Sequence, residues 1–299
     1  MKKMLLVINP RSGKMAVKGH LLELLQIFRE NDWLTTVLIT KAKGEASEIT
    51  YNAEKSGEYD AIVCCGGDGT LSEVINGVVR SGGETPVGYI PAGSTNDFAI
   101  STKIPTDLYE AARYIGKGEK TVSLDAGKFN KDRVFNYIAS FGAFTATSYN
   151  VPQNIKNSLG HFAYLLAGIK DIASVKPYKV SVTTEEKTCE GDYIFGAVCN
   201  SFSVGGIIKL TNKDISLNDG KFEVLLVKMP KNPVEVNKIL WGFINMDFSD
   251  EDVFEFFKAE KVEFTMPEGV DWSLDGEFEK GSEDVLIENI NSAFKLITE

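Results

Sequence analysis

The sequence is poor in the residues that build metal centres and disulfide frameworks. It contains 4 cysteines and 2 histidines among 299 residues. Cys64 and Cys65 are adjacent, whereas Cys189 and Cys199 stand alone, so none of them has the spacing of a metal-ligand motif. We therefore expect small buried thiols in a reducing compartment. Neither histidine lies within a motif, which argues against a catalytic triad.

Long apolar runs are also missing. No stretch approaches the roughly 18 uninterrupted apolar residues of a transmembrane helix. The apolar run at Met4–Ile8 ends at Asn9 and Pro10, too early for the core of a signal peptide. With 43% apolar and 25% charged residues, the composition is typical of a globular chain that is long enough for two cores. We expect a cytoplasmic protein without a transmembrane segment.

A basic excess is absent as well. Residues 1–121 contain 14 basic and 15 acidic residues, residues 122–299 contain 18 and 27, and the formal net charge is −10. Proteins that bind nucleic acid usually present a basic face, so this class is disfavoured. A polyanionic substrate or an anionic membrane would have to be bound by local lysines against the field of the whole chain.

The first 121 residues alternate between apolar strand patterns and amphipathic helix patterns. We expect strands at Met4–Ile8, Thr35–Thr40, Ala61–Cys65 and Val87–Ile90, and helices from about Leu21, over Glu45–Ser56, from about Leu71 and over Leu108–Ile115. Strands that alternate with helices predict a parallel, doubly wound sheet, whose ligands bind at the carboxyl ends of the strands.

After about Thr121 the pattern changes to short β-rich runs separated by Gly, Asn and Asp turns. The expected strands are Val134–Ala139, Lys179–Thr184, Tyr193–Cys199, Phe222–Val227, Lys261–Thr265 and Val285–Glu288. Two helices interrupt them, near Ser158–Ala173 and Val234–Ile244. The sequence therefore predicts an α/β domain over residues 1–121 and a mainly antiparallel, β-sandwich-like domain over residues 122–299. Whether the extreme C-terminus returns to the first domain stays open.

Two glycine-rich loops follow strands of the predicted parallel sheet. Gly66-Gly67-Asp68-Gly69-Thr70 follows the third strand, and Pro91-Ala92-Gly93-Ser94-Thr95-Asn96-Asp97-Phe98 follows the fourth. Glycine lets backbone N–H groups approach phosphate oxygens, and the first loop leads into a helix N-terminus, which favours anions. We therefore expect a polyphosphate between the loops and a metal or proton role for Asp68. A tight turn placed there by backbone geometry alone is the alternative explanation of the first loop. The flanking strand, the amphipathic helix and the polar residues Ser94, Asn96 and Asp97 of the second loop argue against it.

The loops match neither of two common nucleotide-binding motifs. Lys14 follows Gly13, but a Walker A loop also needs glycine and Ser or Thr at positions where this chain has Ile8 and Met15. The three glycines of the first loop do not have the spacing of the dinucleotide fingerprint either. Asn9, Ser12 and Lys14 can still donate hydrogen bonds to a nucleotide.

Several motifs in a shared order make the chain resemble a known family, the diacylglycerol kinase catalytic-domain superfamily. That superfamily contains bacterial soluble lipid kinases and the sphingosine and ceramide kinases. The resemblance covers nearly the whole chain. The motifs that carry it are Asn9–Lys14, Gly66–Val74, Pro91–Phe98, Leu217–Phe222 and Leu274–Glu277.

The resemblance implies ATP- and Mg²⁺-dependent transfer of the γ-phosphate to a lipid hydroxyl, with diacylglycerol as the leading substrate and phosphatidic acid as the product. It implies a nucleotide in a cleft between the two domains. The residues that it places around the nucleotide are Asn9, Ser12, Thr40, Gly66, Gly67, Asp68, Gly69, Thr70, Leu71, Ser72 and Ser94. It implies Glu277 as general base beside Asp68 and Mg²⁺, although either carboxylate can serve as the base.

The resemblance also implies a second, structural Mg²⁺ in the β-rich domain. Its ligands would be Asp214, the Leu217 carbonyl oxygen and Asp219, because hard oxygen donors suit Mg²⁺. An ordinary Asn-Asp-Gly hairpin turn explains the same residues nearly as well. Ala167 stands where related sequences often carry lysine, and Asn218 where an acid is common, which leaves the identity of the lipid open.

Two other functions remain open. A soluble-metabolite kinase similar to NAD kinase would share the Gly-Gly-Asp-Gly loop, but this chain lacks the late Thr-Pro-x-Gly-Ser-Thr-Ala-Tyr hallmark of that family. A nucleotide-binding regulator without transfer activity is the third possibility, against which the intact Asp68 and Glu277 argue.

For the lipid kinase we expect a lipid substrate, peripheral contact with the membrane surface during turnover and no nucleic-acid partner. An exposed edge strand in the β-rich domain would allow a homodimer. Six apolar side chains could form either a lipid-entry surface or a core, and an aromatic cluster is more often core. They are Phe243, Met246, Phe248, Phe254, Phe256 and Phe257.

Overall fold

The computed structural model divides into two compact units. Unit 1 comprises residues 1–126 and 291–299, and unit 2 comprises residues 127–290. The residues that the structure describes are 1–13, 16–94, 96–118, 120–131, 133–142, 176–200, 203–204, 208–209, 218–245, 247–267 and 269–298. The helix expected at Ser158–Ala173 lies outside them. Within these ranges, no helix combines the length and the apolar character needed to cross a membrane.

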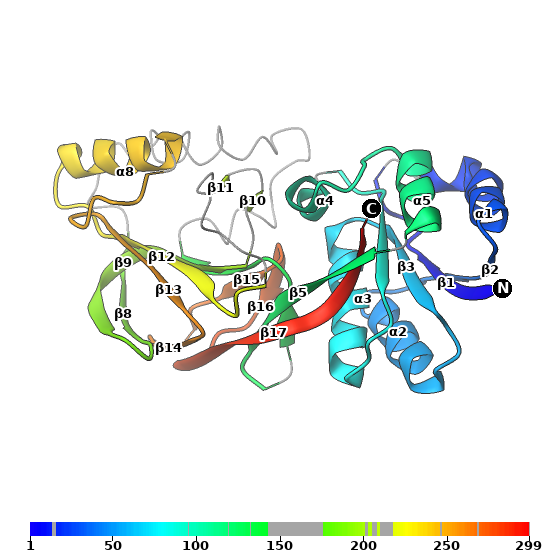
Figure 1. Ribbon diagram of the computed structural model, residues 1–299. Coiled ribbons are helices and arrows are strands. Elements are labelled where there is room, and N and C mark those ends of the chain that lie inside the picture. The colour runs from blue at the N-terminus through cyan, green and yellow to red at the C-terminus, as the bar shows by residue number, and fades with distance from the viewer. Residues whose placement is uncertain are drawn as a thin grey trace. The chain divides into compact units, whose positions relative to one another are not determined.

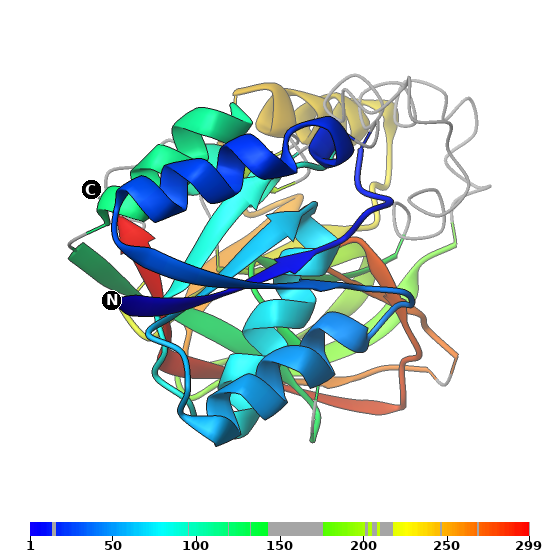
Figure 2. The ribbon, with the colours of Figure 1, turned by 90° about the vertical axis from the view of Figure 1, so that its right-hand side faces the viewer.

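Unit 1 is a parallel sheet with helices on both faces (Figure 1). Its strands are β1 (Lys2–Ile8), β2 (Trp33–Ile39), β3 (Ala61–Gly66), β4 (Val87–Pro91) and the end of β17 (Asp284–Thr298), in the spatial order β2-β1-β3-β4-β17. Its helices are η1 (Ala16–Gly19), α1 (Leu21–Glu30), α2 (Glu45–Ser56), α3 (Asp68–Ser81), α4 (Asp97–Thr102) and α5 (Leu108–Lys117). Figure 2 shows α1 and α5 on one side of these strands and α2 and α3 on the other. The predicted doubly wound sheet is confirmed.

The inner strands β1, from Met4 onward, β3 and β4 are buried on both faces, as a sheet between two helical layers requires. The edge strand β2 is largely exposed. Met4, Leu6 and Ile8 of β1 pack into one apolar cluster with Phe28 of α1 and Ile115 of α5. The alternate β1 side chains are buried against the opposite layer. This continuous apolar pattern is what made the strands visible in the sequence.

Unit 2 is mainly antiparallel. Its strands include β6 (Arg133–Phe135), β7 (Ile138–Gly142), β8 (Tyr178–Thr183), β9 (Thr188–Cys199), β10 (Ser203–Val204), β11 (Ile208–Lys209), β12 (Phe222–Lys228), β13 (Phe254–Ala259), β14 (Lys261–Thr265), β15 (Trp272–Leu274) and β16 (Glu277–Glu279). The main sheet order is β16-β15-β7-β9-β8-β14-β17, and β12 pairs with both β9 and β13. β5 (Lys120–Phe129) and β17 each run from one unit into the other.

Two apolar clusters stabilise unit 2. One surrounds Trp272, whose ring lies 5.0 Å from that of Phe141 and 5.1 Å from that of Phe264. The other lies beneath α8 (Pro233–Asn245) and contains Phe243, Phe248 and Phe254. For these three phenylalanines the core interpretation is therefore confirmed. Phe256 is exposed, Phe257 is partly buried, and Met246 lies outside the described residues.

The predicted strand Val134–Ala139 was wrong in one respect, because the structure divides it into β6 and β7. The backbone N–H groups of Asn136, Tyr137 and Ile138 donate to the carboxylate of Asp275, at 2.8, 3.1 and 3.2 Å. Backbone groups that bind a side chain leave the strand ladder, so pairing stops there. α4, β5 and β13 had no counterpart in the prediction.

Candidate functional site

The loop after β1 is built on Asn9, the residue that follows this strand. Asn9 Nδ2 donates to Thr70 Oγ1 at 2.9 Å, and Asn9 Oδ1 accepts from the backbone N–H of Arg11 at 3.0 Å. Ser12 Oγ accepts from the backbone N–H of Gly67 at 3.2 Å. These contacts connect the loop after β1 to the loop after β3.

Glycine allows three backbone segments to touch at this place. Gly13 has a φ of +53°, and a Cβ there would lie 2.5 Å from the carbonyl oxygen of Ala92. A Cβ on Gly93 would lie 2.7 Å from the Cα of Gly67. Real Cβ atoms do not come this close to backbone, so these positions exclude larger residues. The loops after β1, β3 and β4 therefore pack backbone to backbone.

The first loop leaves the N-terminus of α3 without a side-chain cap. Gly67 is the N-cap residue, with an extended backbone, and its carbonyl oxygen accepts from the N–H groups of Thr70 and Leu71 at 2.9 and 3.0 Å. The aligned dipoles of this 14-residue helix attract negative charge to its first turn. Leu71 and Ser72 are buried, and the N–H of Leu71 is used by the Gly67 carbonyl oxygen, so the first turn of α3 offers an anion mainly the N–H groups that precede them.

Asp68 joins the first loop to the second. Its carboxylate accepts from the backbone N–H groups of Asp97 and Phe98, at 3.1 and 3.3 Å, and from the hydroxyl of Tyr89 at 3.4 Å. Asp68 thus holds the N-terminal end of α4, a short helix of 6 residues. Asn96 Oδ1 accepts from Gly93 N at 2.9 Å and stabilises the turn of the second loop.

Other residues of the first motif have roles in folding. Glu73 accepts from the backbone N–H groups of Gly44 and Ala46, at 2.7 and 3.1 Å, and so holds the start of α2. Cys64 and Cys65 lie fully buried in β3 and form no disulfide. Burial raises the pKa of Cys65 to about 12 and that of Cys64 well above its usual value. Both are therefore neutral thiols at neutral pH, and the prediction of buried thiols is confirmed for this pair.

In unit 2, Glu277 starts β16 next to a guanidinium group. Arg133 Nη2 lies 3.2 Å from Glu277 Oε2, and Arg133 Nε lies 3.5 Å from Glu279 Oε2. Asp275, two residues earlier, is buried and accepts the three backbone hydrogen bonds described above. The Leu274–Glu277 motif thus combines a buried anchor with a carboxylate that an arginine orients.

Asp219 is the one predicted ligand of the structural metal that lies within the described residues. Its Oδ1 accepts from the backbone N–H of Lys221 at 3.1 Å, and its Oδ2 accepts from Lys258 Nζ at 3.0 Å. Asp214 and Leu217 lie outside the described residues. No group of three or more metal-binding side chains forms within the described part of the chain. The structural metal site stays a prediction.

The predicted nucleotide residues gather at the carboxyl ends of four parallel strands. Thr40 follows β2, is buried, and donates its N–H to Ile8 O at 2.9 Å. Gly69 lies in the first turn of α3, and Ser94 is exposed in the second loop. Sequence reasoning missed Tyr89 and Arg133, because a single tyrosine or arginine carries no local signal of its tertiary partner.

Two protein-family models match this chain, one over each of its two parts. Residues 3–129 match the diacylglycerol kinase catalytic domain, and residues 139–298 match the YegS C-terminal NAD kinase beta sandwich-like domain. The two matches cover the α/β part and the β-rich part in the expected order.

Similar proteins carry a consistent name. A protein named diacylglycerol kinase from Bacillus subtilis (strain 168) is 33% identical over 279 residues, which cover 93% of this chain and 90% of the relative. A diacylglycerol kinase from Staphylococcus saprophyticus is 29% identical, with 93% of this chain and 89% of the relative covered. A crystal structure of a diacylglycerol kinase from Bacillus anthracis matches with a TM-score of 0.77 at 21% identity, covering 100% of this chain and 97% of that one. Another structure from that organism matches with a TM-score of 0.83 at 24% identity, covering 100% of this chain and 95% of that one. At these identities the structures establish the fold.

Proposed function

This chain belongs to the diacylglycerol kinase family, and from that premise we propose that it transfers the γ-phosphate of ATP to the free hydroxyl of diacylglycerol, forming phosphatidic acid. The observation that carries the proposal is the backbone contact between the two glycine loops at the uncapped N-terminus of α3. Phosphoryl transfer depends mainly on positioning and on stabilising negative charge, and this arrangement supplies both.

In this proposal, unit 1 binds the phosphates of ATP. The backbone N–H groups of Asp68 and Gly69, in the first turn of α3, and the side chains of Asn9 and Ser12 are the donors. The N–H groups of Gly67, Thr70 and Leu71 are used by hydrogen bonds within the loops. The loops are already connected by hydrogen bonds, such as that between Asn9 and Thr70, so little ordering remains to be done when the nucleotide binds. Ser94, exposed in the second loop, adds a hydroxyl.

Mg²⁺ fits Asp68 as part of a site shared with substrate phosphates. Mg²⁺ is commonly held by one or two carboxylates together with phosphate oxygens rather than by a complete protein cage. An ionised carboxylate has about four lone-pair positions, so the hydrogen bonds that Asp68 accepts need not saturate it. When bound, the ion would neutralise charge on the phosphate oxygens.

Glu277 is the general base of the proposal. Its carboxylate takes the proton of the lipid hydroxyl while the hydroxyl oxygen forms a bond to the γ-phosphorus, and the bond from that phosphorus to the β,γ-bridging oxygen breaks to release ADP. Arg133, at 3.2 Å, restricts the orientation of Glu277. Asp68 remains a positioning group, because it already holds the start of α4.

Glu277→Gln tests the assignment of the base. The amide keeps the shape of the side chain but cannot accept the proton, so we expect kcat to fall by about 10²–10⁴-fold. The dissociation constant for ATP should stay within about twofold, since the nucleotide donors belong to unit 1. Asp68→Asn is the matched variant and should weaken ATP binding as well. Unchanged turnover in Glu277→Gln would contradict the assignment and leave Asp68 as the candidate base.

The substrate is tested by transfer of radiolabelled γ-phosphate in mixed micelles. The acceptors are diacylglycerol, ceramide, sphingosine, phosphatidylglycerol and undecaprenol, with NAD as a soluble control. We expect labelled phosphatidic acid. Labelled NAD would establish a metabolite kinase instead, and ATP binding without any labelled product would favour a regulator.

A further inference from the structure

Helix α8 exposes an apolar stripe. Val234, Trp241 and Ile244 are 65%, 62% and 49% exposed, although α8 covers the core of unit 2 with its other side. At 3.6 residues per turn, these three side chains and Asn237 lie on one face of the helix. We call Val234, Asn237, Trp241, Ile244 and the exposed Asn245 the α8 stripe.

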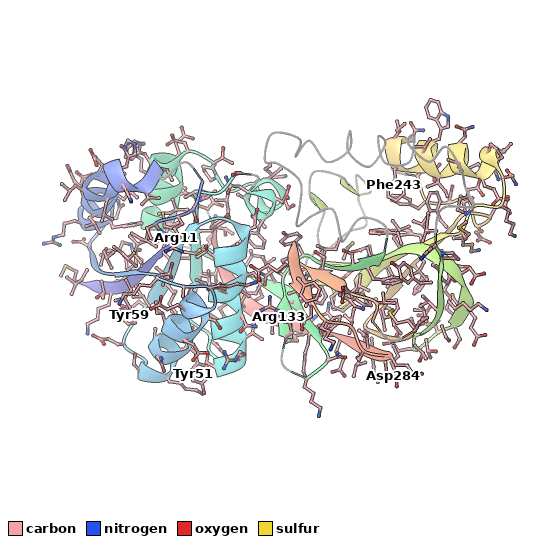
Figure 3. All side chains as sticks on the ribbon, turned by 180° about the vertical axis from the view of Figure 1, so that it is seen from behind. Arg11, Tyr51, Tyr59, Arg133, Phe243 and Asp284 are labelled. Atoms are coloured by element: carbon pink, nitrogen blue, oxygen red, sulfur yellow. The ribbon has the colours of Figure 1, made fainter. Side chains whose placement is uncertain are left out.

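The orientation of the stripe is fixed by the buried side of α8. Ile239 and Phe243 are almost fully buried, and the Phe243 ring lies 5.2 Å from that of Phe248 and 5.9 Å from that of Phe254. Figure 3 shows Phe243 on the side of α8 that faces the strands. The helix therefore cannot turn to bury Trp241 without exposing these rings.

The stripe contains no charged residue, and two charged residues of the same helix have partners elsewhere. Lys238, at the edge of the stripe, lies 2.9 Å from Asp250 Oδ2 and 2.8 Å from Asp252 Oδ2. Both aspartates raise the pKa of Lys238, which stays charged but is neutralised by its partners. Glu235 accepts from Lys231 N and Asn232 Nδ2 at the start of the helix. An uncharged stripe in a chain of net charge −10 suits an apolar partner rather than an ionic one.

We propose that the α8 stripe inserts into the interfacial layer of a lipid bilayer and docks the enzyme on its substrate membrane. This inference rests on the proposed function and names the surface that would bring the enzyme to a lipid. Tryptophan favours the boundary between water and hydrocarbon, because its ring is apolar and its indole N–H needs a polar partner. Asparagines beside it can meet lipid headgroups.

The size of the stripe favours a membrane over a second protein. From Val234 to Ile244 the helix rises about 15 Å, and its exposed width is about 10 Å, which gives about 150 Å². A stable protein interface buries about 800 Å² on each partner. A bilayer needs no matching surface and accepts a narrow apolar face at its boundary.

The test uses a Trp241→Asn and Ile244→Asn double variant and vesicles of phosphatidylcholine without diacylglycerol or ATP. Because both side chains are exposed, the variant should keep its thermal stability. We expect the fraction bound in vesicle flotation to fall about tenfold relative to the unchanged protein. Leu22→Asn, at a side chain that is 80% exposed on α1, is the matched control and should bind like the unchanged protein.

Trp241 gives a second measurement, since Trp33 and Trp272, the other two tryptophans, are buried. Brominated lipids should quench the emission of Trp241, and Trp241→Phe should remove this quenching. Equal binding of the double variant would overturn the proposal. So would binding that needs anionic lipid and disappears in salt, or a change in oligomeric state caused by the double substitution.

The two proposals can fail separately. Flotation involves no phosphoryl transfer, so vesicle binding without phosphatidic acid production would contradict only the proposed function. Conversely, the double variant should phosphorylate a short-chain, water-dispersed diacylglycerol at the normal rate. A loss of that activity would place the stripe in substrate binding and contradict a docking role.

Discussion

Glu223 places a carboxylate inside unit 2, where its side chain is 2% exposed and its Oε1 lies 3.3 Å from Lys258 Nζ. Burial raises the pKa of Glu223 by more than the neighbouring ammonium lowers it. A carboxyl group whose pKa is higher in the folded than in the unfolded state binds protons more readily when folded. The favourable contribution of this bound proton to the free energy of unfolding is therefore complete below the unfolded pKa of 4.5. It is lost as the pH rises through the higher pKa of the folded state.

Glu223→Gln should accordingly flatten the pH dependence of stability. We expect Glu223 to make the free energy of unfolding fall as the pH rises above about 4.5, and the variant to lose this contribution to the slope. Lys258 keeps Asp219 as a partner at 3.0 Å, so no ammonium is left unpaired. Urea unfolding across this range is the measurement. Glu263→Gln, in an exposed pair with Lys261, is the control and should keep the original slope.

Asp275 is a second buried carboxylate with a structural task, since it accepts hydrogen bonds from three consecutive backbone N–H groups. Asp275→Ala should lower the free energy of unfolding by about 3 kcal/mol or more, because several buried donors lose a charged acceptor. It should also reduce kcat, since Glu277 lies two residues away. Asp275→Asn keeps an acceptor and tolerates the φ of +50° at this position. A loss in Asp275→Asn as large as in Asp275→Ala would count against the hydrogen-bond explanation.

At the scale of elements, the contact between loops depends on Gly13. Gly13→Ala should raise the dissociation constant of ATP by about tenfold or more, because the new Cβ would meet the Ala92 carbonyl at 2.5 Å and separate the loops. Gly57→Ala is the matched control. Gly57 also has a positive φ, of +61°, but a Cβ added there would have no atom of another residue within 4 Å, its chain neighbours aside.

The control should therefore lose about 1 kcal/mol of stability from backbone strain alone and bind ATP normally. Isothermal titration with ATP and urea unfolding separate the two effects. Equal ATP affinity in Gly13→Ala and the unchanged protein would mean that loop packing does not position the nucleotide donors.

Individual helices and strands also show where prediction from a local sequence pattern succeeds. α2 and β14 begin and end at the predicted residues, Glu45–Ser56 and Lys261–Thr265. Their apolar spacing is visible within a short window. α4 is held at its start by Asp68, which lies about 30 residues earlier in the chain, so no short window contains both the helix and its capping group.

At the scale of the whole molecule, the last residues of the chain complete the sheet of unit 1. Leu296 is buried, belongs to β17 and pairs in parallel with Val87 of β4. Leu296→Ala should lower the free energy of unfolding by about 2–5 kcal/mol, through lost burial and a cavity. Urea unfolding is the measurement. Lys295→Ala, at the neighbouring residue, removes an exposed pair with Glu84 and should change the free energy of unfolding far less than Leu296→Ala. Equal losses in both variants would contradict a core role for this segment.

The candidate site combines residues that local motifs reveal with residues that only contacts between distant segments bring in. The glycine loops, Asp68 and Glu277 stand out in the sequence, because their motifs are contiguous. Arg133, which orients Glu277, is 144 positions away from it in the chain, so the sequence around one residue does not indicate the other. The assignment of nucleotide and catalytic roles to these residues stays a proposal.

The sequence by itself determined the alternating α/β half, the β-rich half and the family, because apolar periodicity and short motifs are properties of neighbouring residues. Only the tertiary structure decided where a strand is interrupted, which side of α8 is exposed and which strand lies beside β4 in the sheet of unit 1. Asp275 interrupts a strand 139 positions away from it, between β6 and β7. Such contacts depend on which distant segments the folded chain brings together, and that information lies in no single stretch of sequence.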